Sequence, residues 1–312
     1  MRMKTLVSWS SGKDSAWMLH LLKQDPAVHV GALLTTMNEE FDRVAMHAVR
    51  RRLLEEQSHA AGIPLYTVPL PWPCTNEQYE GRMRDAVAQA VGDGFTHVAF
   101  GDLFLEDVRR YREDRLAGTG LAPMFPLWGK PTPALAEEMI DGGLRAVLTC
   151  INPKHLDRSF AGREFDRALL RDLPAGIDPC GEYGEFHSFA YDGPMFDRPI
   201  SALAGEIVDR DGFVFADVCW RRLLLGPLDR HLRRDEAGGE GLVHQSLNGG
   251  AAAVAVVERE LVDVHAHEPI GVFTIESASI FHRVVERGLA VREAVRNAVV
   301  KHARDLRDVR GP

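Results

Sequence analysis

The sequence predicts an α/β protein: a parallel sheet with helices on both faces, a smaller α+β lobe and a C-terminal helical extension. Short, continuously apolar segments recur through the first half of the chain with helical stretches between them, which is typical of buried parallel strands. After Asn152 the composition shifts to Gly, Pro, Asp and aromatic residues. We therefore expect a sheet domain over residues 1–152, a small lobe over 153–228, and a linker with an extension over 229–312.

The elements of the first half follow from apolar spacing and stop signals. Gly62 and Pro64 end an amphipathic pattern that begins near Arg43, and Asn76 is expected to cap the next helix. The expected strands are 5–9, 28–36, 63–70, 97–101 and 145–151, the last as a fifth strand of the same sheet, and the expected helices are 14–23, 43–61 and 76–91.

The second half is expected to hold less regular elements. Residues 176–199 are predicted to form an ordered loop, and residues 205–218 a hairpin that turns at Asp211-Gly212. Beyond them we expect a linker at 235–241, a strand at 252–264 and a long helix at 277–309. That helix would pack on the core or on a second subunit of a homo-oligomer.

Composition narrows the class of protein. A formal net charge of −8 argues against bulk nucleic-acid binding. No apolar run approaches the roughly 20 residues that cross a bilayer, and the N-terminus has no signal-peptide pattern. The four cysteines lie far apart, which favours a reduced, cytoplasmic protein over a disulfide framework or a zinc knuckle.

The strongest motif lies where the first strand ends and the first helix begins. N–H groups at a helix start attract phosphate, glycine allows close approach, and a lysine adds positive charge. Asp14 could hold Mg²⁺ or cap the helix, and the alternative for the whole segment is an ordinary capped helix. The residues are Ser10, Ser11, Gly12, Lys13, Asp14 and Ser15, which lack the spacing of a Walker A loop.

A second motif ends the fourth expected strand at Gly101-Asp102, where ligands of parallel sheets bind. Arg109 and Arg112 follow it three residues apart on a helix, so that they could clamp a phosphate or a carboxylate together. The alternative is a solvated helix with internal ion pairs.

The third motif, residues 178–188, concentrates carboxylates and a histidine in one loop. Glu182, Glu185 and His187 could bind a metal, orient an amine or act as a general base. Cys180 could be a nucleophile, although no partner histidine has a recognisable spacing. The alternative is a structural loop whose carboxylates accept backbone N–H groups.

Two further histidine positions are expected to have no catalytic role. His47 is predicted to be a packing residue on the second helix. The His265-Ala-His267-Glu268 fragment has the spacing of no standard metal site.

The loop at residues 10–15 resembles the pyrophosphate loop of the N-type ATP pyrophosphatases, with Ser11 in place of a glycine. Together the motifs resemble the diphthine–ammonia ligase family, and Asp178-Pro179-Cys180 with Gln57 and Tyr79 is more similar to its bacterial branch. The resemblance also rests on Met46-His47, Phe100 to Asp102, Arg109 to Glu113, Pro126 to Trp128, Leu156-Asp157, Gly162-Arg163, Gly181 to Ser188 and Asp192 to Phe196.

This resemblance implies a HUP-type nucleotide-binding domain with a substrate lobe, and ATP and Mg²⁺ as cofactors. ATP would adenylate a small or protein-bound carboxylate, releasing pyrophosphate, and ammonia would then displace AMP to form an amide. In the best-known members the acid is diphthine, which a bacterial chain would not meet. The implied nucleotide-binding residues are Ser10, Ser11, Gly12, Lys13, Asp14, Ser15, Leu34, Thr35, Thr36, Gly101 and Arg109, and the implied catalytic residues are Lys13, Asp102, Glu182, Glu185 and His187.

Two other functions fit the same loop. A thiolation enzyme would need a persulfide cysteine, for which Cys180 is the candidate, and a basic face if it acted on tRNA. A nucleotide-binding sensor without catalysis would use the C-terminal helical segment to dock a partner.

Overall fold

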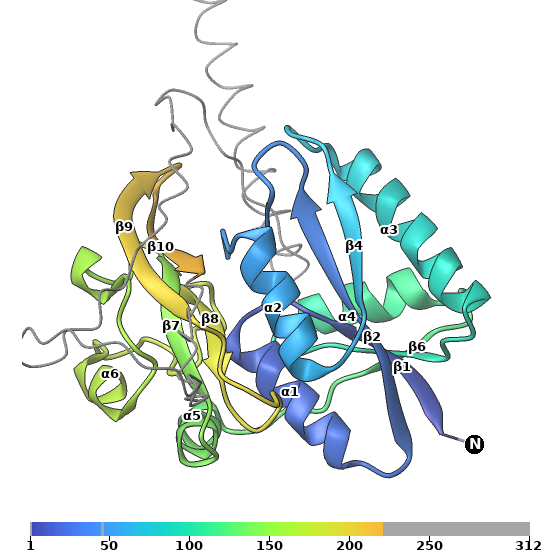
Figure 1. Cartoon of the computed structure of the whole chain (residues 1–312), viewed down its shortest axis with the longest axis horizontal. Helices are drawn as coiled ribbons and strands as arrows, with labels where there is room; N and C mark the ends of the chain where they lie inside the picture. The colour runs from blue at the N-terminus through green and yellow to red at the C-terminus, as the bar shows by residue number, and fades with distance from the viewer. Residues whose placement is uncertain (1, 45–46, 221–312) are drawn as a thin grey trace, which may run out of the picture. The chain divides into compact units, whose positions relative to one another are not determined.

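The computed structural model describes residues 2–44 and 47–220, which form two sheets and the helices around them (Figure 1). The expected linker at 235–241, the strand at 252–264 and the helix at 277–309 lie outside these residues, as do Met46 and the His265 to Glu268 fragment. None of the described helices is long and apolar enough to cross a bilayer.

The first sheet is parallel except at one short edge piece. Its order places β1 at the centre, with β2 and then β4 on one side and β5 and then β6 on the other. Because the strand order reverses between β1 and β5, the crevice above their carboxyl ends is the place where such sheets bind ligands. The strands are β1 (Met3–Ser8), β2 (Val28–Asn38), β3 (Arg43–Val44, antiparallel to β2), β4 (Leu65–Leu70), β5 (His97–Ala99) and β6 (Ala122–Met124).

Helices cover both faces of this sheet, as the sequence predicts (Figure 1). Neighbouring residues of β1 point to opposite faces, so that Val7 belongs to the core under α1 (Lys13–Gln24) and α2 (Arg51–Ala61). Leu6 belongs to the second core, under α3 (Asn76–Gly92) and the end of α4 (Glu106–Leu116). The α/β layering is thereby confirmed.

The second sheet is antiparallel throughout, in the order β8-β7-β10-β9. Asp211 and Gly212 turn the β9–β10 hairpin with φ angles of 50° and 82°, which confirms the predicted turn. Its strands are β7 (Arg145–Ile151), β8 (Phe186–Asp192), β9 (Ala202–Arg210) and β10 (Phe213–Trp220), and the helices beside it are α5 (Thr132–Asp141), the 3₁₀ turn η1 (Arg158–Phe160) and α6 (Arg167–Asp172).

Two strand assignments need correction. Residues 145–151 form a strand, but β7 pairs antiparallel with β8 and β10 and is no fifth strand of the parallel sheet. A strand buried on both faces gives the same apolar run in either kind of sheet, so the pattern does not identify its partners. The predicted loop at 176–199 contains β8, whose burial in the second sheet was not apparent from its Gly- and Pro-rich flanks.

The second helix is shorter than predicted. The pattern from Arg43 contains β3 and a tight connection, in which Val44 N donates to Val49 O at 2.8 Å, and α2 begins only at Arg51. His47 therefore lies in a loop and not on a helix. Asn76 is likewise the first residue of α3, not its cap, because Thr75 forms a capping box with Gln78.

Candidate active site

The loop at residues 10–15, which runs from beyond the end of β1 into the first turn of α1, approaches the second sheet closely. Ser11 is buried and has a φ angle of 69°, a left-handed conformation that residues with a side chain rarely adopt. Gly12 leaves no room for a side chain, since a Cβ atom there would lie 2.8 Å from His47 Cε1 and 3.1 Å from Ser188 O. Glycine is needed here for space and not for backbone conformation, because its φ angle of −87° is one that other residues adopt readily.

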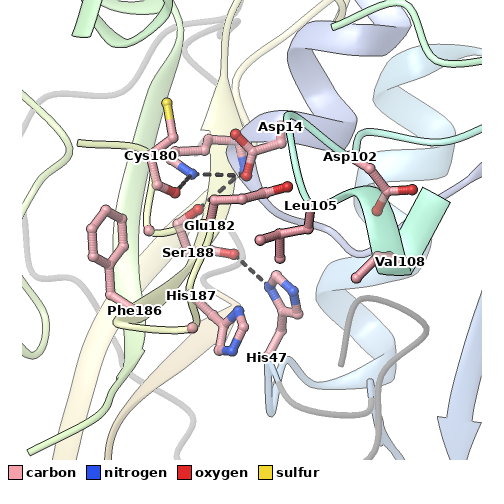
Figure 2. A pocket seen from close by; sticks show the side chains of 13 residues that line it. Asp14, His47, Asp102, Leu105, Val108, Cys180, Glu182, Phe186, His187 and Ser188 are labelled. Carbon is pink, nitrogen blue, oxygen red and sulfur yellow. Dashed lines mark hydrogen bonds and ion pairs between the residues drawn. The ribbon is translucent and has the colours of Figure 1, made fainter. Parts of the chain in front are cut away.

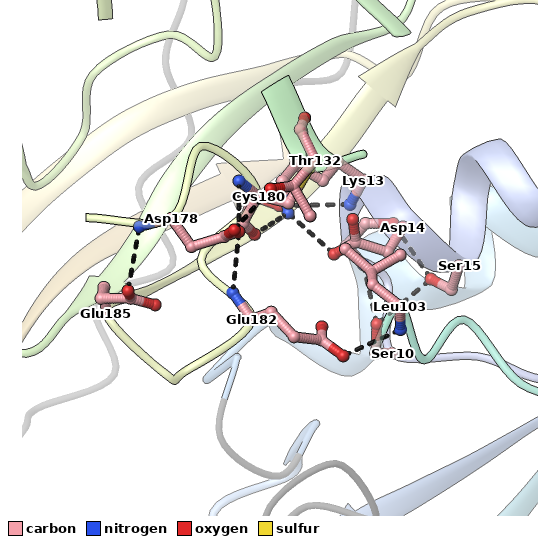
Figure 3. Close-up of polar contacts among 12 residues, drawn as sticks. Ser10, Lys13, Asp14, Ser15, Leu103, Thr132, Asp178, Cys180, Glu182 and Glu185 are labelled. Atoms are coloured by element: carbon pink, nitrogen blue, oxygen red, sulfur yellow. Dashed lines mark hydrogen bonds and ion pairs between the residues drawn. The ribbon is translucent and has the colours of Figure 1, made fainter. Parts of the chain in front are cut away.

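Lys13 is the buried cation of this loop. Its ammonium donates to Asp14 Oδ2 at 2.8 Å and to the carbonyl oxygen of Cys180, and its side chain is only 2% exposed. Burial is the largest single influence and lowers the pKa of the ammonium, but Asp14, Cys180 and Glu182 together outweigh it and raise the pKa above the usual lysine value. Lys13 therefore stays charged beside Asp14 (Figure 3).

Strand β8 of the second sheet forms the opposite wall. Ser188 Oγ accepts from Lys13 N at 3.1 Å, and the Ser188 carbonyl lies 2.9 Å from His47 Nδ1. Ala190 N donates to Ser11 O at 2.9 Å. The loop is thus shaped by contacts with both sheets and not by β1 and α1 alone.

The segment after β5 brings a second carboxylate close to the loop. Gly101 lies against the start of α1, since a Cβ atom there would be 3.4 Å from Ser15 N, an ordinary contact distance. Asp102 accepts from Arg112 Nε at 2.5 Å and from Arg112 Nη2 at 2.9 Å, and both side chains are 3% exposed. Arg112 is thus paired with Asp102, whereas Arg109 pairs with a different carboxylate.

Arg109 lies away from the loop at residues 10–15. Its guanidinium pairs with Glu113 at 2.8 Å and lies 4.8 Å from the ring centroids of both Phe125 and Trp128. Such an exposed pair on a helix is the solvated alternative that the sequence left open.

The two glutamates of the loop at 178–186 have different positions. Glu182 extends toward the segment after β5, where its Oε1 atom accepts from Leu103 N at 2.8 Å (Figure 3). Glu185 is buried and turned into its own loop, accepting from Asp178 N at 3.1 Å and from Tyr183 N at 3.0 Å. Glu185 thus has the structural arrangement of a carboxylate that organises backbone N–H groups.

These segments enclose one pocket (Figure 2). The rings of His47 and His187 lie side by side in it, with their centroids 4.8 Å apart. Its central volume of about 30 Å³ holds roughly two water-sized molecules. The lining residues are Lys13, Asp14, His47, Asp102, Leu105, Val108, Cys180, Gly181, Glu182, Gly184, Phe186, His187 and Ser188.

Several predicted site residues do not line this pocket. Thr35 and Thr36 are buried in β2, and Thr35 Oγ1 donates to Trp9 O at 2.7 Å. The last residue of β1, Ser8, pairs with Leu34 of β2. Because β2 continues beyond Leu34, the backbone groups of its next residues face no residue of β1. The predicted residues outside the lining are Ser10, Ser11, Gly12, Ser15, Leu34, Thr35, Thr36, Gly101, Arg109 and Glu185.

The Cys180 thiol is poorly placed for nucleophilic chemistry. The residue is 2% exposed, and its sulfur donates to Thr132 O at 3.6 Å, while its carbonyl oxygen and not its thiol reaches Lys13. Burial raises the pKa of this thiol, against a smaller opposing effect of Lys13, so the thiolate is disfavoured.

Comparison with known proteins decides the family. The model of the diphthamide synthase N-terminal domain matches residues 3–119, and that of the C-terminal domain matches residues 131–216, together more than half of the chain. The chain belongs to the diphthamide synthase family. A diphthine–ammonia ligase of Danio rerio is 30% identical over 242 residues, covering 68% of this chain and 91% of the relative.

More distant relatives in the diphthamide synthase family have the same name. The diphthine–ammonia ligase of Bos taurus is 24% identical over 248 residues, 72% of this chain and 91% of the relative. That of Schizosaccharomyces pombe is 23% identical over 239 residues, 71% of this chain but 39% of the relative. As a member of this family, the chain is an ATP-dependent carbon–nitrogen ligase of the pyrophosphate-loop type.

The sequence missed three residues that shape the site of this diphthamide synthase family member. His47 was expected to pack on a helix, Ser188 was named only as the end of a range that carries the resemblance, and Leu103 was not considered. The apolar spacing across residues 43–61 concealed the break at which His47 lies, so the pattern did not place this histidine outside the helix.

Proposed function

We propose that this ligase adenylates a carboxylate with ATP, releasing pyrophosphate, and then amidates it with ammonia. The observation that supports this most directly is the meeting of Lys13 and Asp14 with Glu182 and His187 around one small cavity. The positive charge of Lys13, which could neutralise a phosphate, and the Glu182 and His187 side chains, which could accept a proton from an amine, would thus lie close to one reacting carbon.

The loop at residues 10–15 would hold the phosphates. The start of α1 supplies N–H groups and a positive dipole end, and the permanently charged Lys13 would offset negative charge on the departing pyrophosphate. The end of β2 would hold the adenine through its backbone, from Leu34, which pairs with Ser8, to Thr35 and Thr36, which extend beyond the pairing with β1.

Mg²⁺ would bind through few protein ligands. No group of three metal-ligating side chains occurs among the residues that the structure describes, but Mg²⁺ on ATP needs only one or two carboxylates besides phosphate oxygens. Asp14, whose side chain is 20% exposed beside Lys13, fits that requirement. The ion would supply further charge neutralisation at the phosphates.

Ammonia fits the small cavity. A central volume of about 30 Å³ is large enough for an ammonia-sized molecule. Glu182 and His187 line it and would accept the proton that the attacking nitrogen loses, while Asp102, bound to Arg112, would hold the floor of the pocket in place. The relatives are named for diphthine, and we propose a diphthine-like carboxylate, small or protein-bound, as the acid.

The reaction is balanced by two displacements. A carboxylate oxygen attacks the α-phosphorus and pyrophosphate leaves. The nitrogen of ammonia then attacks the acyl carbon, AMP leaves with the carboxylate oxygen, and one proton passes to the enzyme or to solvent.

An isotope experiment tests this order. The protein is incubated with ATP, Mg²⁺, ammonium and a candidate acid labelled with ¹⁸O in its carboxylate, and the nucleotide products are analysed by mass spectrometry. We expect unlabelled pyrophosphate and AMP that contains one ¹⁸O atom. When hydroxylamine replaces ammonium, we expect a hydroxamate. Formation of ADP and phosphate would refute the proposal.

A further inference from the structure

The side-chain amide of Gln57 makes hydrogen bonds to the loop at residues 10–15 and to the strand beside it. It lies on α2 and is fully buried. Its Nε2 atom donates to Ser11 O at 2.9 Å and to Ala190 O at 2.6 Å, and its Oε1 atom accepts from Trp9 Nε1 at 2.9 Å. One side chain thus connects the end of β1, the loop and β8.

The Ser11 carbonyl receives two hydrogen bonds, one from Gln57 and one from Ala190 N at 2.9 Å. Ser11 has a φ angle of 69°, a conformation that is costly for a residue with a Cβ atom. A conformation of this kind persists only where its surroundings hold it. The two donors are the restraint that the structure provides.

The direction of this carbonyl sets the direction of the next N–H group. In a trans peptide the Ser11 oxygen and the Gly12 hydrogen point to opposite sides of one plane. With the oxygen turned inward to Gln57, Gly12 N faces the other way, where it donates to Ser10 Oγ at 3.3 Å. A flipped peptide would instead present a carbonyl oxygen to a phosphate and repel it.

We propose that Gln57 is a positioning residue for ATP, which acts through the Ser11 carbonyl to keep the Gly12 N–H group directed at the phosphates. This inference rests on the proposed function, because it takes the loop at residues 10–15 as the phosphate site. Glycine at position 11 would need less restraint, since it adopts positive φ angles without cost from a side chain. Serine makes the loop dependent on Gln57.

The test measures ATP dissociation constants by titration calorimetry on the full chain with Mg²⁺. Gln57→Leu removes both restraining donations of the amide. Ser58→Ala is the matched control, because Ser58 neighbours Gln57 on α2, is buried and donates to Ile63 O at 2.7 Å without touching the loop. Each protein is also prepared with Ser11→Gly, and its melting temperature is recorded.

We expect Gln57→Leu to weaken ATP binding about tenfold, a loss on the scale of one buried hydrogen bond. Ser58→Ala should change the ATP dissociation constant less than about twofold, although this variant loses a comparable hydrogen bond. With glycine at position 11, Gln57→Leu should weaken ATP binding about threefold or more less than it does with Ser11 present.

Two results overturn the inference while the proposed function stands: Gln57→Leu binding ATP as tightly as Ser58→Ala, or Ser11→Gly having the same effect in both backgrounds. If Gln57→Leu does not fold, Trp9→Phe replaces it, because it removes the bond that anchors Gln57 Oε1 and keeps an aromatic ring in the core. A loss of about threefold, recovered by Ser11→Gly, is then expected, and no recovery refutes the inference. Failure of the wild type to bind ATP would refute the phosphate site itself.

Discussion

Glu182 Oε1 lies 2.8 Å from the backbone nitrogen of Leu103 and accepts its hydrogen. This bond joins the loop before β8 to the segment after β5, two parts of the chain that belong to different sheets. It places the Glu182 carboxylate at the pocket, whereas Glu185, three residues later, turns away into its own loop.

The two glutamates should therefore respond differently to the same substitution. We expect Glu182→Gln to lower kcat about 100-fold or more, because glutamine keeps the acceptor for Leu103 N but takes up no proton. The KM for ATP should stay within about threefold. In Glu185→Gln, kcat should stay close to that of the wild type while stability falls by about 1–3 kcal/mol, since one buried acceptor is lost. Steady-state kinetics and urea unfolding distinguish them, and equal kcat losses would contradict the assignment.

Two glycines offer a matched pair. Gly12→Ala would place a methyl group 2.8 Å from His47 Cε1, so we expect ATP binding to weaken about tenfold or more and stability to fall by about 1–3 kcal/mol. At Gly81, in α3, an added Cβ meets nothing within 4 Å, and Ala should stabilise the helix by about 0.5–1 kcal/mol. Calorimetry of ATP binding with thermal unfolding measures both. Unchanged ATP binding in Gly12→Ala would show that the close approach does not matter.

The buried pair of Asp102 and Arg112 should matter far more than an exposed one. Asp102→Asn would leave the Arg112 guanidinium buried without its carboxylate, and we expect the free energy of unfolding to fall by about 3 kcal/mol. In the control, Glu113→Gln removes the exposed partner of Arg109 and should cost less than about 1 kcal/mol. Urea unfolding of the three proteins checks this, and similar losses in both variants would argue against the pair as an anchor.

The pH dependence of Lys13 has a defined sign. Its pKa is higher in the folded chain than the usual 10.5, so the stability it contributes is fully present below the unfolded pKa and is lost only as the pH rises through the folded pKa. The difference in unfolding free energy between the wild type and Lys13→Met should therefore be constant from about pH 6 to pH 10 and decline above that range. A decline centred near neutral pH would contradict the assignment of a charged lysine.

The Cys180 thiol should be dispensable. Because it is buried and its pKa is raised, we expect Cys180→Ala to retain activity within about threefold and the native thiol to react slowly with an alkylating reagent at pH 8. Cys219, which is only half-buried, provides the comparison in the same alkylation experiment. Loss of all activity in Cys180→Ala would revive the thiolation alternative.

The sequence predicted those parts of the fold in which local chemistry determines local structure. The turn at Asp211-Gly212 follows from the few conformations that such residues favour, and the start of α1 directly after the first strand follows from the local pattern. The same is true of the strands around them. Local pattern could not assign β7 to its sheet, because an apolar run is buried equally well beside parallel or antiparallel partners.

The candidate site was predictable in its motifs and not in its contacts. Glu182 and Glu185 have the same chemistry and lie in one loop, yet only the pairing of Leu103 N with one of them distinguishes their positions. His47 was misplaced because residues 43–61 keep an apolar spacing across a break in which Ala48 has a φ angle of 53°. Both outcomes depend on neighbours that are distant in sequence.

The contacts between β8 and the loop at residues 10–15 also order events during synthesis. Lys13 N and Ser188 Oγ are 175 residues apart in the chain, so the loop at residues 10–15 cannot take its final shape until β8 has left the ribosome. A nascent chain that carries only the parallel sheet would hold this loop without its contacts to β8. We therefore expect unfinished copies of the protein to lack the proposed phosphate site.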